Sequence, residues 1–399
     1  MIQAGEIYLD NAATTRCDDE VLAAMDAAFR VDFGNPSSMH RKGYEAEQLM
    51  KNAQKTLAGT LGVSPAEILF TSGGTESDNL AILGCARANA RRGRHLVTTA
   101  IEHAAVAKTM EALAEEGFEV TVLPVDDRGL VDPQAAAGAV REDTVLVSVM
   151  AVNNEIGAVQ DLRAIGRAIR AKNRAVLFHT DAVQAYGKVP VDVRECGIDL
   201  LSVSGHKFHG PKGTGFLYVK KGTKIRPILF GGGQQNGLRS GTDNVPGAVG
   251  LAAAAQKAID GQRQFAGRLI GLRDAFIREI TEQMTDVRIN GPAGCSAEEM
   301  HRGEQAAPHI VSLSVPGVRA EVLLHALEDA HIYVSAGSAC SSHAAKKTPG
   351  TATLRAIGLP EDCLASTIRL SLSRDTTEEE LRETAAALGE IVPRLRRYR

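Results

Sequence analysis

The sequence contains no tryptophan, and only 4% of its 399 residues are aromatic. It also has no run of about 18 consecutive apolar residues, so it predicts no transmembrane helix. The first residues, MIQAGEIYLDNAATT, lack the basic segment and apolar stretch of a secretory signal. We therefore expect a cytoplasmic protein that makes no contact with a membrane.

An excess of charge of one sign is absent too. The chain has 45 Lys and Arg residues against 48 Asp and Glu residues, a net charge of −3, and no basic block is interleaved with aromatic residues. This mixture gives no polyanion-binding surface, so we predict no direct contact with nucleic acid.

Paired cysteines are also missing, because no CxxC motif occurs. A chain of this kind is expected to keep its thiols reduced rather than to build a disulfide framework. The default interpretation of each cysteine is a small buried apolar residue. The six scattered cysteines are Cys17, Cys85, Cys196, Cys295, Cys340 and Cys363.

What the chain does have, between about residues 65 and 230, is a regular alternation of short apolar runs with helical patterns. Such alternation predicts a mostly parallel α/β sheet covered by helices on both faces. The predicted strands are Ile68–Thr71, His95–Thr99, Val120–Pro124, Thr144–Val149, Val176–His179 and Leu200–Val203. The predicted helices are Glu76–Arg91, Ala104–Glu116 and Leu162–Lys172, with a further turn after Asp181.

The remainder of the chain predicts a second, smaller α+β domain. Residues 248–285 form a long Ala-rich helical stretch, followed by strand patterns at His309–Val315 and Ile368–Leu372 and a charged helix after Thr377. We expect a large domain over residues 16–260 and a small domain made of residues 1–15 and 261–399.

Ligands of open α/β sheets bind at the carboxyl ends of the strands, so polar residues that directly follow a strand are candidates for a site. The first candidate is Ser72-Gly73-Gly74-Thr75, where two glycines and the start of a helix near Glu76 suit an anion. The alternative is an ordinary glycine turn in which Thr75 is the helix N-cap.

Three further candidates follow later strands. Asp181 stands just past an apolar run, with Gln184 one helical turn away, and Lys207 follows another run among small residues. Desolvation would lower the pKa of such a lysine, as imine formation requires. The alternatives are a helix cap for Asp181 and a solvated loop lysine for Lys207.

Together these signals indicate pyridoxal 5'-phosphate, which needs a phosphate cradle, an acid opposite its ring nitrogen and an imine-forming lysine. Two more strand ends add His103, which could stack on a flat ring and move protons, and Asn154, which could hydrogen-bond a ring oxygen. Either could instead be a half-buried polar residue with its hydrogen bonds satisfied.

These residues resemble those of the class V aminotransferase superfamily, specifically the NifS/IscS-type cysteine desulfurases. The resemblance covers nearly the whole chain. It rests on YLDNAATT, GNPSSMH, TSGGTESDN, EHAAV, AVNNEIGAVQD, HTDAVQ, SGHKFHGPKG, GGGQQNGLRSGTDN, SAGSACSS and IRLSLSRDTTEEE. It implies the fold type I of pyridoxal-phosphate-dependent transferases and a homodimer.

By this resemblance each site residue has an expected role. Lys207 would bind the cofactor covalently, Asp181 would face the ring nitrogen, Gln184 the phenolic oxygen, and His103 would stack on the ring and shuttle protons. Arg369 would hold the substrate carboxylate, assisted by Asn35 and near Asn154. The phosphate would be held by Gly74, Thr75, Ser204 and His206, and by Thr242 reaching from the neighbouring subunit.

The departures from the family pattern are small. Gln235 stands where many relatives carry Glu, Ala151 where some carry His, and Gly205 where some carry Ala. None of the three removes a group that the chemistry needs.

The residues around Cys340 narrow the reaction. Cys340 lies in SAGSACSS, and the polar residues that follow, up to Gly350, indicate a mobile loop at about residues 335–352. Such a loop suits a thiol that takes up sulfur as a persulfide and delivers it elsewhere. The alternatives are a buried inert cysteine or a metal ligand with His343, but no second Cys/His pair is present, so no metal site is predicted.

We therefore predict conversion of L-cysteine to L-alanine, with sulfur transferred to Cys340. Cys340 and Arg369 are 29 residues apart, which resembles the long-loop group that passes sulfur to an iron–sulfur scaffold protein of the IscU or NifU kind. A selenocysteine lyase, another aminotransferase of the superfamily and a non-catalytic sulfur-relay component remain open as alternatives.

Overall fold

The computed structural model describes residues 5–294, 305–336 and 352–397. Its centre is a seven-stranded sheet with the strand order β2-β8-β7-β6-β5-β3-β4. All strands run parallel except β8, which pairs antiparallel with both β2 and β7. The strands are β2 (Ile68–Thr71), β3 (His95–Thr99), β4 (Glu119–Leu123), β5 (Thr144–Ser148), β6 (Leu177–Asp181), β7 (Leu200–Ser204) and β8 (Gly215–Val219).

The six predicted strands are confirmed to within about two residues at each end. β8 has no counterpart among the predicted strands, because its sequence, GFLYV, follows a glycine-rich segment that resembles a loop. This antiparallel strand is the one exception to the mostly parallel sheet.

Helices cover both faces of the sheet, as the alternation of patterns predicts. Neighbouring strand residues point to opposite faces, so Leu96 and Val97 belong to two different apolar clusters. One cluster includes α2 (Arg41–Leu61), α5 (Pro133–Ala139), α6 (Leu162–Lys172) and α7 (Val245–Asp260); the other includes α3 (Gly74–Asn89) and α4 (Ala104–Glu115). Helix α1 (Asp19–Arg30) packs on α7.

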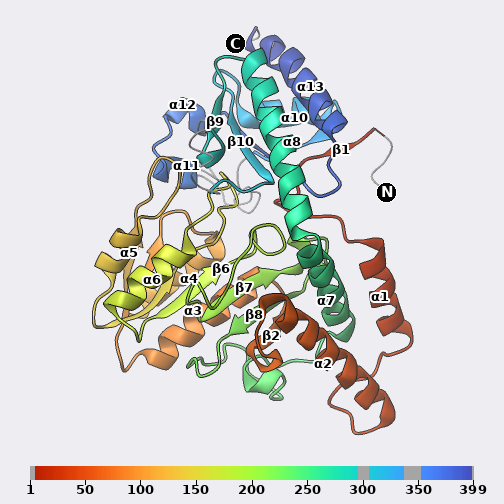
Figure 1. Cartoon of the computed structure of the whole chain (residues 1–399), viewed down its shortest axis with the longest axis vertical. Helices are drawn as coiled ribbons and strands as arrows, with labels where there is room; N and C mark the ends of the chain where they lie inside the picture. The colour runs from red at the N-terminus through yellow and green to blue at the C-terminus, as the bar shows by residue number, and fades with distance from the viewer. Residues whose placement is uncertain (1–4, 295–304, 337–351, 398–399) are drawn as a thin grey trace.

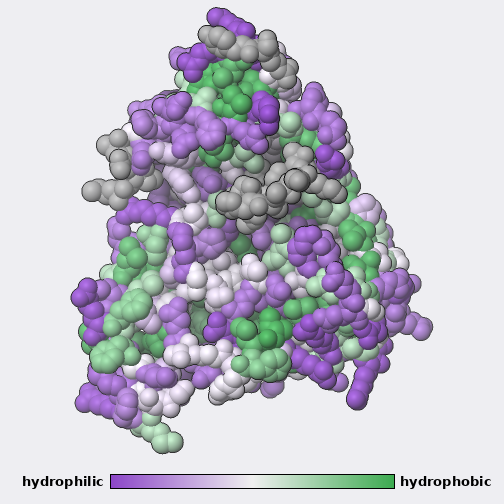
Figure 2. Space-filling model, turned by 180° about the vertical axis from the view of Figure 1, so that it is seen from behind, coloured by the Kyte–Doolittle hydropathy of each residue, from purple (hydrophilic) through white to green (hydrophobic). Residues whose placement is uncertain are grey.

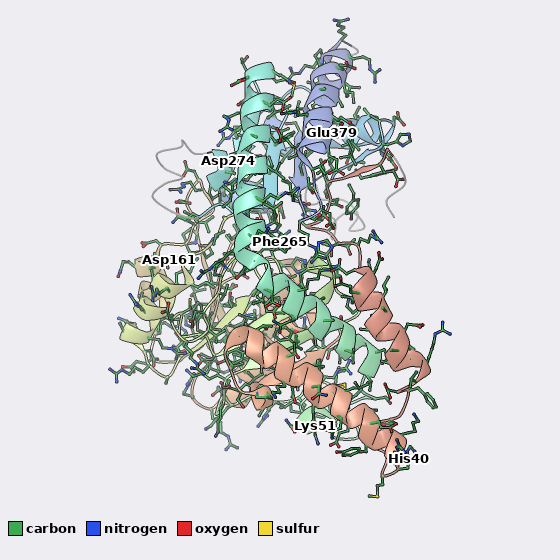
Figure 3. All side chains as sticks on the ribbon, turned by 45° about the vertical axis from the view of Figure 1, so that its right-hand side comes forward. His40, Lys51, Asp161, Phe265, Asp274 and Glu379 are labelled. Carbon is green, nitrogen blue, oxygen red and sulfur yellow. The ribbon has the colours of Figure 1, made fainter. Side chains whose placement is uncertain are left out.

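The single helical stretch predicted over residues 248–285 is wrong, because it divides at Gly261 into α7 and α8 (Gln262–Gln283). A Cβ atom at Gly261 would lie 2.0 Å from the ring of Phe265, so the glycine lets this ring pack over the break. Figure 3 shows Phe265 at this junction, and in Figure 1 α8 rises from the central sheet to the upper part of the molecule.

The upper part contains a three-stranded antiparallel sheet with the order β12-β10-β9. Its strands are β9 (Arg288–Asn290), β10 (Ile310–Ser314) and β12 (Thr367–Ser371), and α10 (Ala320–Glu328) and α13 (Glu378–Arg396) pack against them with α8 in a third apolar cluster. Two short helices complete this part, α11 (Ala352–Ala356) and α12 (Glu361–Leu364).

The first described residues join the upper part rather than the central sheet. β1 (Ile7–Tyr8) pairs in parallel with β11 (Ile332–Tyr333), and Asp10 bridges to Ser371. The chain then passes down to α1, as Figure 1 shows. Across residues 5–294, 305–336 and 352–397, none of the helices has the length and apolar character needed to span a membrane.

Candidate active site

A cavity of about 170 Å³ opens where the parallel strands β2, β3, β5, β6 and β7 end. The carboxyl ends of parallel strands lie at one edge of a sheet, so residues distant in sequence meet here. The predicted site residues that line the cavity are Gly74, Thr75, His103, Asn154, Asp181, Gln184, Ser204, His206, Lys207 and Arg369.

Two predicted residues, Asn35 and Thr242, do not line this cavity, and a third lies outside the described residues. Asn35 and Thr242 are both exposed, and the side-chain oxygen of Asn35 accepts a hydrogen bond from the backbone N–H of Ser37. Cys340, with His343, falls in residues 337–351, outside the described residues.

One end of the cavity suits an anion. β2 leads into Gly73, whose φ of +146° favours glycine, and α3 begins at Gly74. The first N–H groups of a helix have no partner within the helix, and the helix dipole adds positive charge there. A Cβ atom at Gly74 would lie 2.7 Å from Cγ2 of Val183, so a side chain at this position would collide with the cavity wall.

The alternative interpretation of this turn is wrong in one respect: the N-cap of α3 is Gly73, and Thr75 lies inside the helix. Thr75 is exposed and, with Ser204 and His206, also lines an adjoining pocket that includes Ser72. Hydroxyl and imidazole groups therefore surround the helix N-terminus from which the N–H groups point.

Asp181 ends β6 at the bottom of the cavity and is 5% exposed. Its Oδ1 accepts a hydrogen bond from the backbone N–H of Val183 at 2.9 Å. Burial, and then the neighbouring carboxylate of Asp78, raise the pKa of Asp181 to about 7. A cationic ring nitrogen placed against this carboxylate would offset both effects.

Lys207 follows β7 in a single turn of 3-10 helix, Gly205–Lys207. Its Nζ donates hydrogen bonds to the carbonyl oxygens of Ala12 and Ala13, each at 2.7 Å. The amine thus lies against the N-terminal segment at the wall of the cavity, and Lys207 is half-buried.

His103 is the N-cap of α4, and its Nδ1 accepts a hydrogen bond from the backbone N–H of Ala105 at 3.1 Å. This bond fixes the orientation of the ring and leaves Nε2 as the nitrogen for other partners. Gln184 is 4% exposed and donates from Nε2 to the carbonyl oxygen of Ala12 at 2.9 Å.

Arg369, on β12, brings a guanidinium group from the upper part of the molecule to the cavity, and only 2% of the residue is exposed. Its Nη1 donates to the carbonyl oxygen of Asn154 at 2.9 Å, and its Nη2 donates to Oδ1 of Asp10 at 2.8 Å. Its Nε has no hydrogen-bond partner among the described residues. A buried guanidinium with an unused N–H favours a further anionic ligand.

Two carboxyl groups beside this cavity are not among the predicted site residues. Burial raises the pKa of Glu102 to about 8 and that of Glu155 to about 7. Glu102 accepts hydrogen bonds from Thr99 Oγ1 and Met150 N, while its Oε2 is buried without a partner among the described residues. The sequence signals were present: Glu102 precedes His103, and Glu155 follows the paired asparagines.

The residues present fit pyridoxal phosphate. The cavity combines a glycine-lined helix N-terminus for a phosphate, a buried carboxylate whose pKa is raised by burial, and an amine for an aldehyde. These three groups come from β2, β6 and β7. The arrangement therefore matches the donor set that this cofactor requires.

Comparison with known proteins gives consistent matches over almost the whole chain. The family model described as "Aminotransferase class-V" matches residues 7–383. The chain is 42% identical over 391 residues to the cysteine desulfurase IscS of Dictyoglomus turgidum, covering 98% of this chain and 95% of the relative.

Two solved structures are similar as well. A structure titled "NIFS-like protein" has a TM-score of 0.89 and 39% identity, covering 97% of this chain and 99% of its own. A second, titled "SspA in complex with cysteine", has a TM-score of 0.77 and 33% identity, covering 93% of this chain and 100% of its own. Both match the fold and the length of this chain.

Proposed function

Since the chain belongs to the class-V aminotransferase family, we propose that it is a pyridoxal-5'-phosphate-dependent cysteine desulfurase, which converts L-cysteine to L-alanine and transfers the sulfur to Cys340 as a persulfide. The observation that carries the proposal is the meeting of the Lys207 amine and the buried Arg369 guanidinium in one cavity. An amino-acid substrate needs both groups, one for each of its ends. Relatives named as cysteine desulfurases support the choice of cysteine.

In this proposal the cofactor is held by residues of the central sheet. Lys207 binds its aldehyde, Asp181 faces the ring nitrogen and Gln184 the ring oxygen, while His103 stacks on the ring. The phosphate is held by the N–H groups at the start of α3 and by Gly74, Thr75, Ser204 and His206. When bound, pyridoxal phosphate supplies a ring that accepts the electrons released from the substrate Cα.

Arg369 positions the substrate. Its Nε, together with the outer edge of the guanidinium, binds the cysteine carboxylate, while Asp10 and the Asn154 carbonyl keep the group oriented. Asn154 lies beside the same cavity and contacts substrate or cofactor.

Two groups handle protons. Lys207, as a neutral amine, would take the α-proton of the substrate and return a proton to Cα when alanine forms. His103 uses Nδ1 to accept from Ala105, so its Nε2 is the atom that exchanges protons in the cavity. Glu102 and Glu155 are buried nearby with raised pKa values and thus hold protons near neutral pH.

In the sulfur-transfer step, the Cys340 thiolate attacks the sulfur of the substrate and forms an S–S bond. The carbon–sulfur bond breaks, its electron pair stays with the β-carbon, and that carbon takes up a proton, so that alanine leaves. Cys340 follows the described residue Ser335 by five positions, and five residues span at most about 17 Å. Because Ser335 is hydrogen-bonded to Arg369, a chain of this length from Ser335 supports the assignment of Cys340.

Mass spectrometry after incubation with L-cysteine tests the proposal. We expect one added sulfur atom on the Cys340 peptide, alanine as the product, and a cofactor that borohydride fixes to Lys207. Cys340→Ser should keep the bound cofactor and lose sulfide release, whereas Cys17→Ser, at a partly exposed thiol, should keep both. Sulfide release at the parent rate from Cys340→Ser would contradict the persulfide assignment.

The product also separates the alternatives. An aminotransferase would give the keto acid mercaptopyruvate rather than alanine from cysteine, because transamination leaves the carbon–sulfur bond intact. A selenocysteine lyase would turn over selenocysteine in strong preference to cysteine, and a non-catalytic sulfur-relay component would give none of these products. Measuring alanine, mercaptopyruvate and selenide in parallel distinguishes all three.

A homodimer is part of the proposal. Large apolar side chains are exposed along α1 and in the segment up to the start of α2, which begins next to His40 at the lower corner of Figure 3. Exposed apolar patches of this kind are typical of interfaces. We call this set the α1–α2 patch: Leu22, Phe29, Val31, Phe33, Met39 and Tyr44. Thr242, which is exposed and outside the cavity, would bind the phosphate of the second subunit.

Figure 2 shows the face opposite to that of Figure 1, where separate hydrophobic patches are set among hydrophilic residues. A surface of mixed character suits transient contact with a sulfur acceptor. We propose that the acceptor is an iron–sulfur scaffold protein of the IscU or NifU kind. The described cysteines Cys17, Cys85, Cys196 and Cys363 are free thiols, which supports a reducing, cytoplasmic location.

We also propose the division into a large domain, residues 16–260, and a small domain, residues 1–15 and 261–399, which carries the Cys340 loop. Support comes from the apolar clusters, because Ile7 and Leu9 pack with Leu269 of α8 and the second sheet. Arg369 would then bring the small domain to the cofactor held by the large one.

A further inference from the structure

A second cavity, of about 40 Å³, shares Lys207 with the active-site cavity. Its wall is formed by the segment after β6, by α7 and α8, and by the residues next to β10 and β12. Phe265, at the junction of α7 and α8 in Figure 3, contributes to this wall. Lys207 therefore lies between two cavities, only one of which the proposed chemistry uses.

The side chain of Lys188 also lines this second cavity. Gly187, with a φ of +75°, makes the turn before it, and a Cβ atom there would lie 2.7 Å from Cβ of Ala258. This close approach to α7 directs the lysine inward. Its Nζ is buried and has no hydrogen-bond partner among the described residues.

An unpartnered buried amine costs folding free energy, so a structural role does not explain it. The wall of the cavity is mostly apolar and gives the Lys188 amine no hydrogen-bond acceptor among the described residues. The polar neighbour His309 is completely buried, and its Nδ1 also lacks a partner among the described residues. The Nε2 atom of His309 lies 3.4 Å from Oε1 of Gln184. Residues that reduce stability are concentrated at functional sites.

The charged groups around this cavity are basic. Besides Lys188 and Lys207, the described residues that line it include His209, His309 and Arg374, and no carboxylate lines it. Asp18, which is not part of this lining, is paired with Arg374 and lies 3.8 Å from His209.

In such surroundings, a positive charge on either amine disfavours a positive charge on the other. Burial first, and then the charges of Lys207 and Arg369, lower the pKa of Lys188 to about 7. Electrostatic coupling is reciprocal, so a proton on Lys188 opposes a proton on Lys207 to the same extent. Burial and Lys188 together also hold the pKa of His309 well below its ordinary value, so the imidazole is neutral.

We propose that Lys188 is a positioning residue for the desulfurase reaction: across the cavity that they share, the positive charge of Lys188, whenever this amine is protonated, disfavours the protonated form of the Lys207 nitrogen. This inference rests on the proposed function, because it assigns the effect to the lysine that binds the cofactor and removes the α-proton. A second cationic group beside a reactive lysine is a recognised means of keeping that lysine neutral.

The test compares the cofactor-loaded parent with Lys188→Met, Lys188→Gln and Lys188→Arg. The absorbance of the bound cofactor reports whether the nitrogen that joins it to Lys207 carries a proton, so a pH titration gives the proton affinity without turnover. Lys51→Met, at an exposed lysine on α2, is the matched control.

We expect the titration midpoint to rise by about half a pH unit or more in Lys188→Met and Lys188→Gln, because a nearby positive charge is removed. Lys188→Arg and Lys51→Met should not raise it. The melting temperature of Lys188→Met at pH 7 should equal or exceed that of the parent, because an unpaired buried amine is replaced by an apolar chain of similar length.

An unchanged midpoint in both Lys188→Met and Lys188→Gln overturns the inference, and so does an equal rise in Lys188→Arg, which would indicate a general disturbance of packing. If a variant fails to fold, the midpoint of the other decides. A parent protein whose Lys207 forms no borohydride-reducible bond with the cofactor would instead refute the proposed function itself, so the two failures are distinguishable.

Discussion

Ser335 and Arg369 exchange both of their backbone hydrogen bonds: Arg369 N donates to Ser335 O at 2.7 Å, and Ser335 N donates to Arg369 O at 3.1 Å. The segment that leads to Cys340 thus starts beside the arginine that lines the active-site cavity. A substrate whose carboxylate is bound at Arg369 would hold its sulfur within reach of this segment.

Arg369→Lys should raise KM for cysteine by about 10- to 100-fold with a smaller change in kcat, because an ammonium group cannot replace the planar guanidinium fork. Steady-state alanine production measures both constants. Arg273→Lys is the matched control, since Arg273 is a buried arginine, 3% exposed, that donates to the carbonyl oxygens of Ala306 and Ala307 outside the cavity. An equal rise in KM for both variants would contradict a specific role of Arg369.

Asp181→Asn should stabilise the cofactor-free protein at pH 8 and leave its stability at pH 4 unchanged. The folded-state pKa of Asp181, about 7, lies above the unfolded value, so its carboxylate reduces stability as the pH rises from about 4 and does so fully above pH 7. Removing the charge should raise the free energy of unfolding by on the order of 1–3 kcal/mol at pH 8. Urea unfolding at the two pH values measures this difference.

The same substitution should weaken the cofactor-loaded enzyme, because the ring nitrogen loses its carboxylate. Asp199→Asn provides the contrast, since Asp199 is a buried acid paired with Arg170 and Lys220, and its loss should destabilise the protein. Destabilisation by Asp181→Asn at pH 8 in the absence of cofactor would show that the carboxylate has a partner that the described residues do not supply.

Gly74→Ala should weaken binding of pyridoxal phosphate by about 10-fold or more, because the added methyl group, 2.7 Å from Val183 Cγ2, displaces the wall of the phosphate end. Fluorescence titration of the cofactor-free protein measures the affinity. Gly59→Ala, on the exposed side of α2 with no atom within 4 Å, should keep the affinity and stabilise the helix by up to about 1 kcal/mol. Equal cofactor affinity in Gly74→Ala and the parent would argue against this phosphate site.

Phe33→Asp should convert a dimer to monomers, because it places a charge in the α1–α2 patch, where Phe33 is 69% exposed. Light scattering after size-exclusion chromatography gives the mass. Val122→Asp, at a 55%-exposed apolar residue on the edge strand β4, should leave the mass unchanged. If Phe33→Asp remains a dimer, the interface lies elsewhere.

The fold was largely predictable from local sequence patterns, and the errors of that prediction have local causes. The strand His95–Thr99, HLVTT, contains β-branched residues that favour a strand, and it was placed correctly: all five residues are buried in the parallel sheet. β8 was not predicted, because its short run beside glycines shows no alternating pattern. Its antiparallel direction depends on pairing with β2 and β7. In the sequence, Gly261 resembles an ordinary helix residue. Only the structure shows that the ring of Phe265 packs over it.

For the site, the sequence by itself determined which groups are available: small residues before a helix, an acid, an amide and a lysine after strands, and a thiol among small polar residues. That a parallel sheet brings strand ends together is a general consequence of its geometry, so their meeting was foreseeable. What only the tertiary structure decided is which of them are buried, and against what. The raised pKa values of Asp181 and Glu102, the unused N–H of Arg369 and the unpartnered amine of Lys188 all arise from segments distant in sequence that exclude water together, and no local pattern encodes that exclusion.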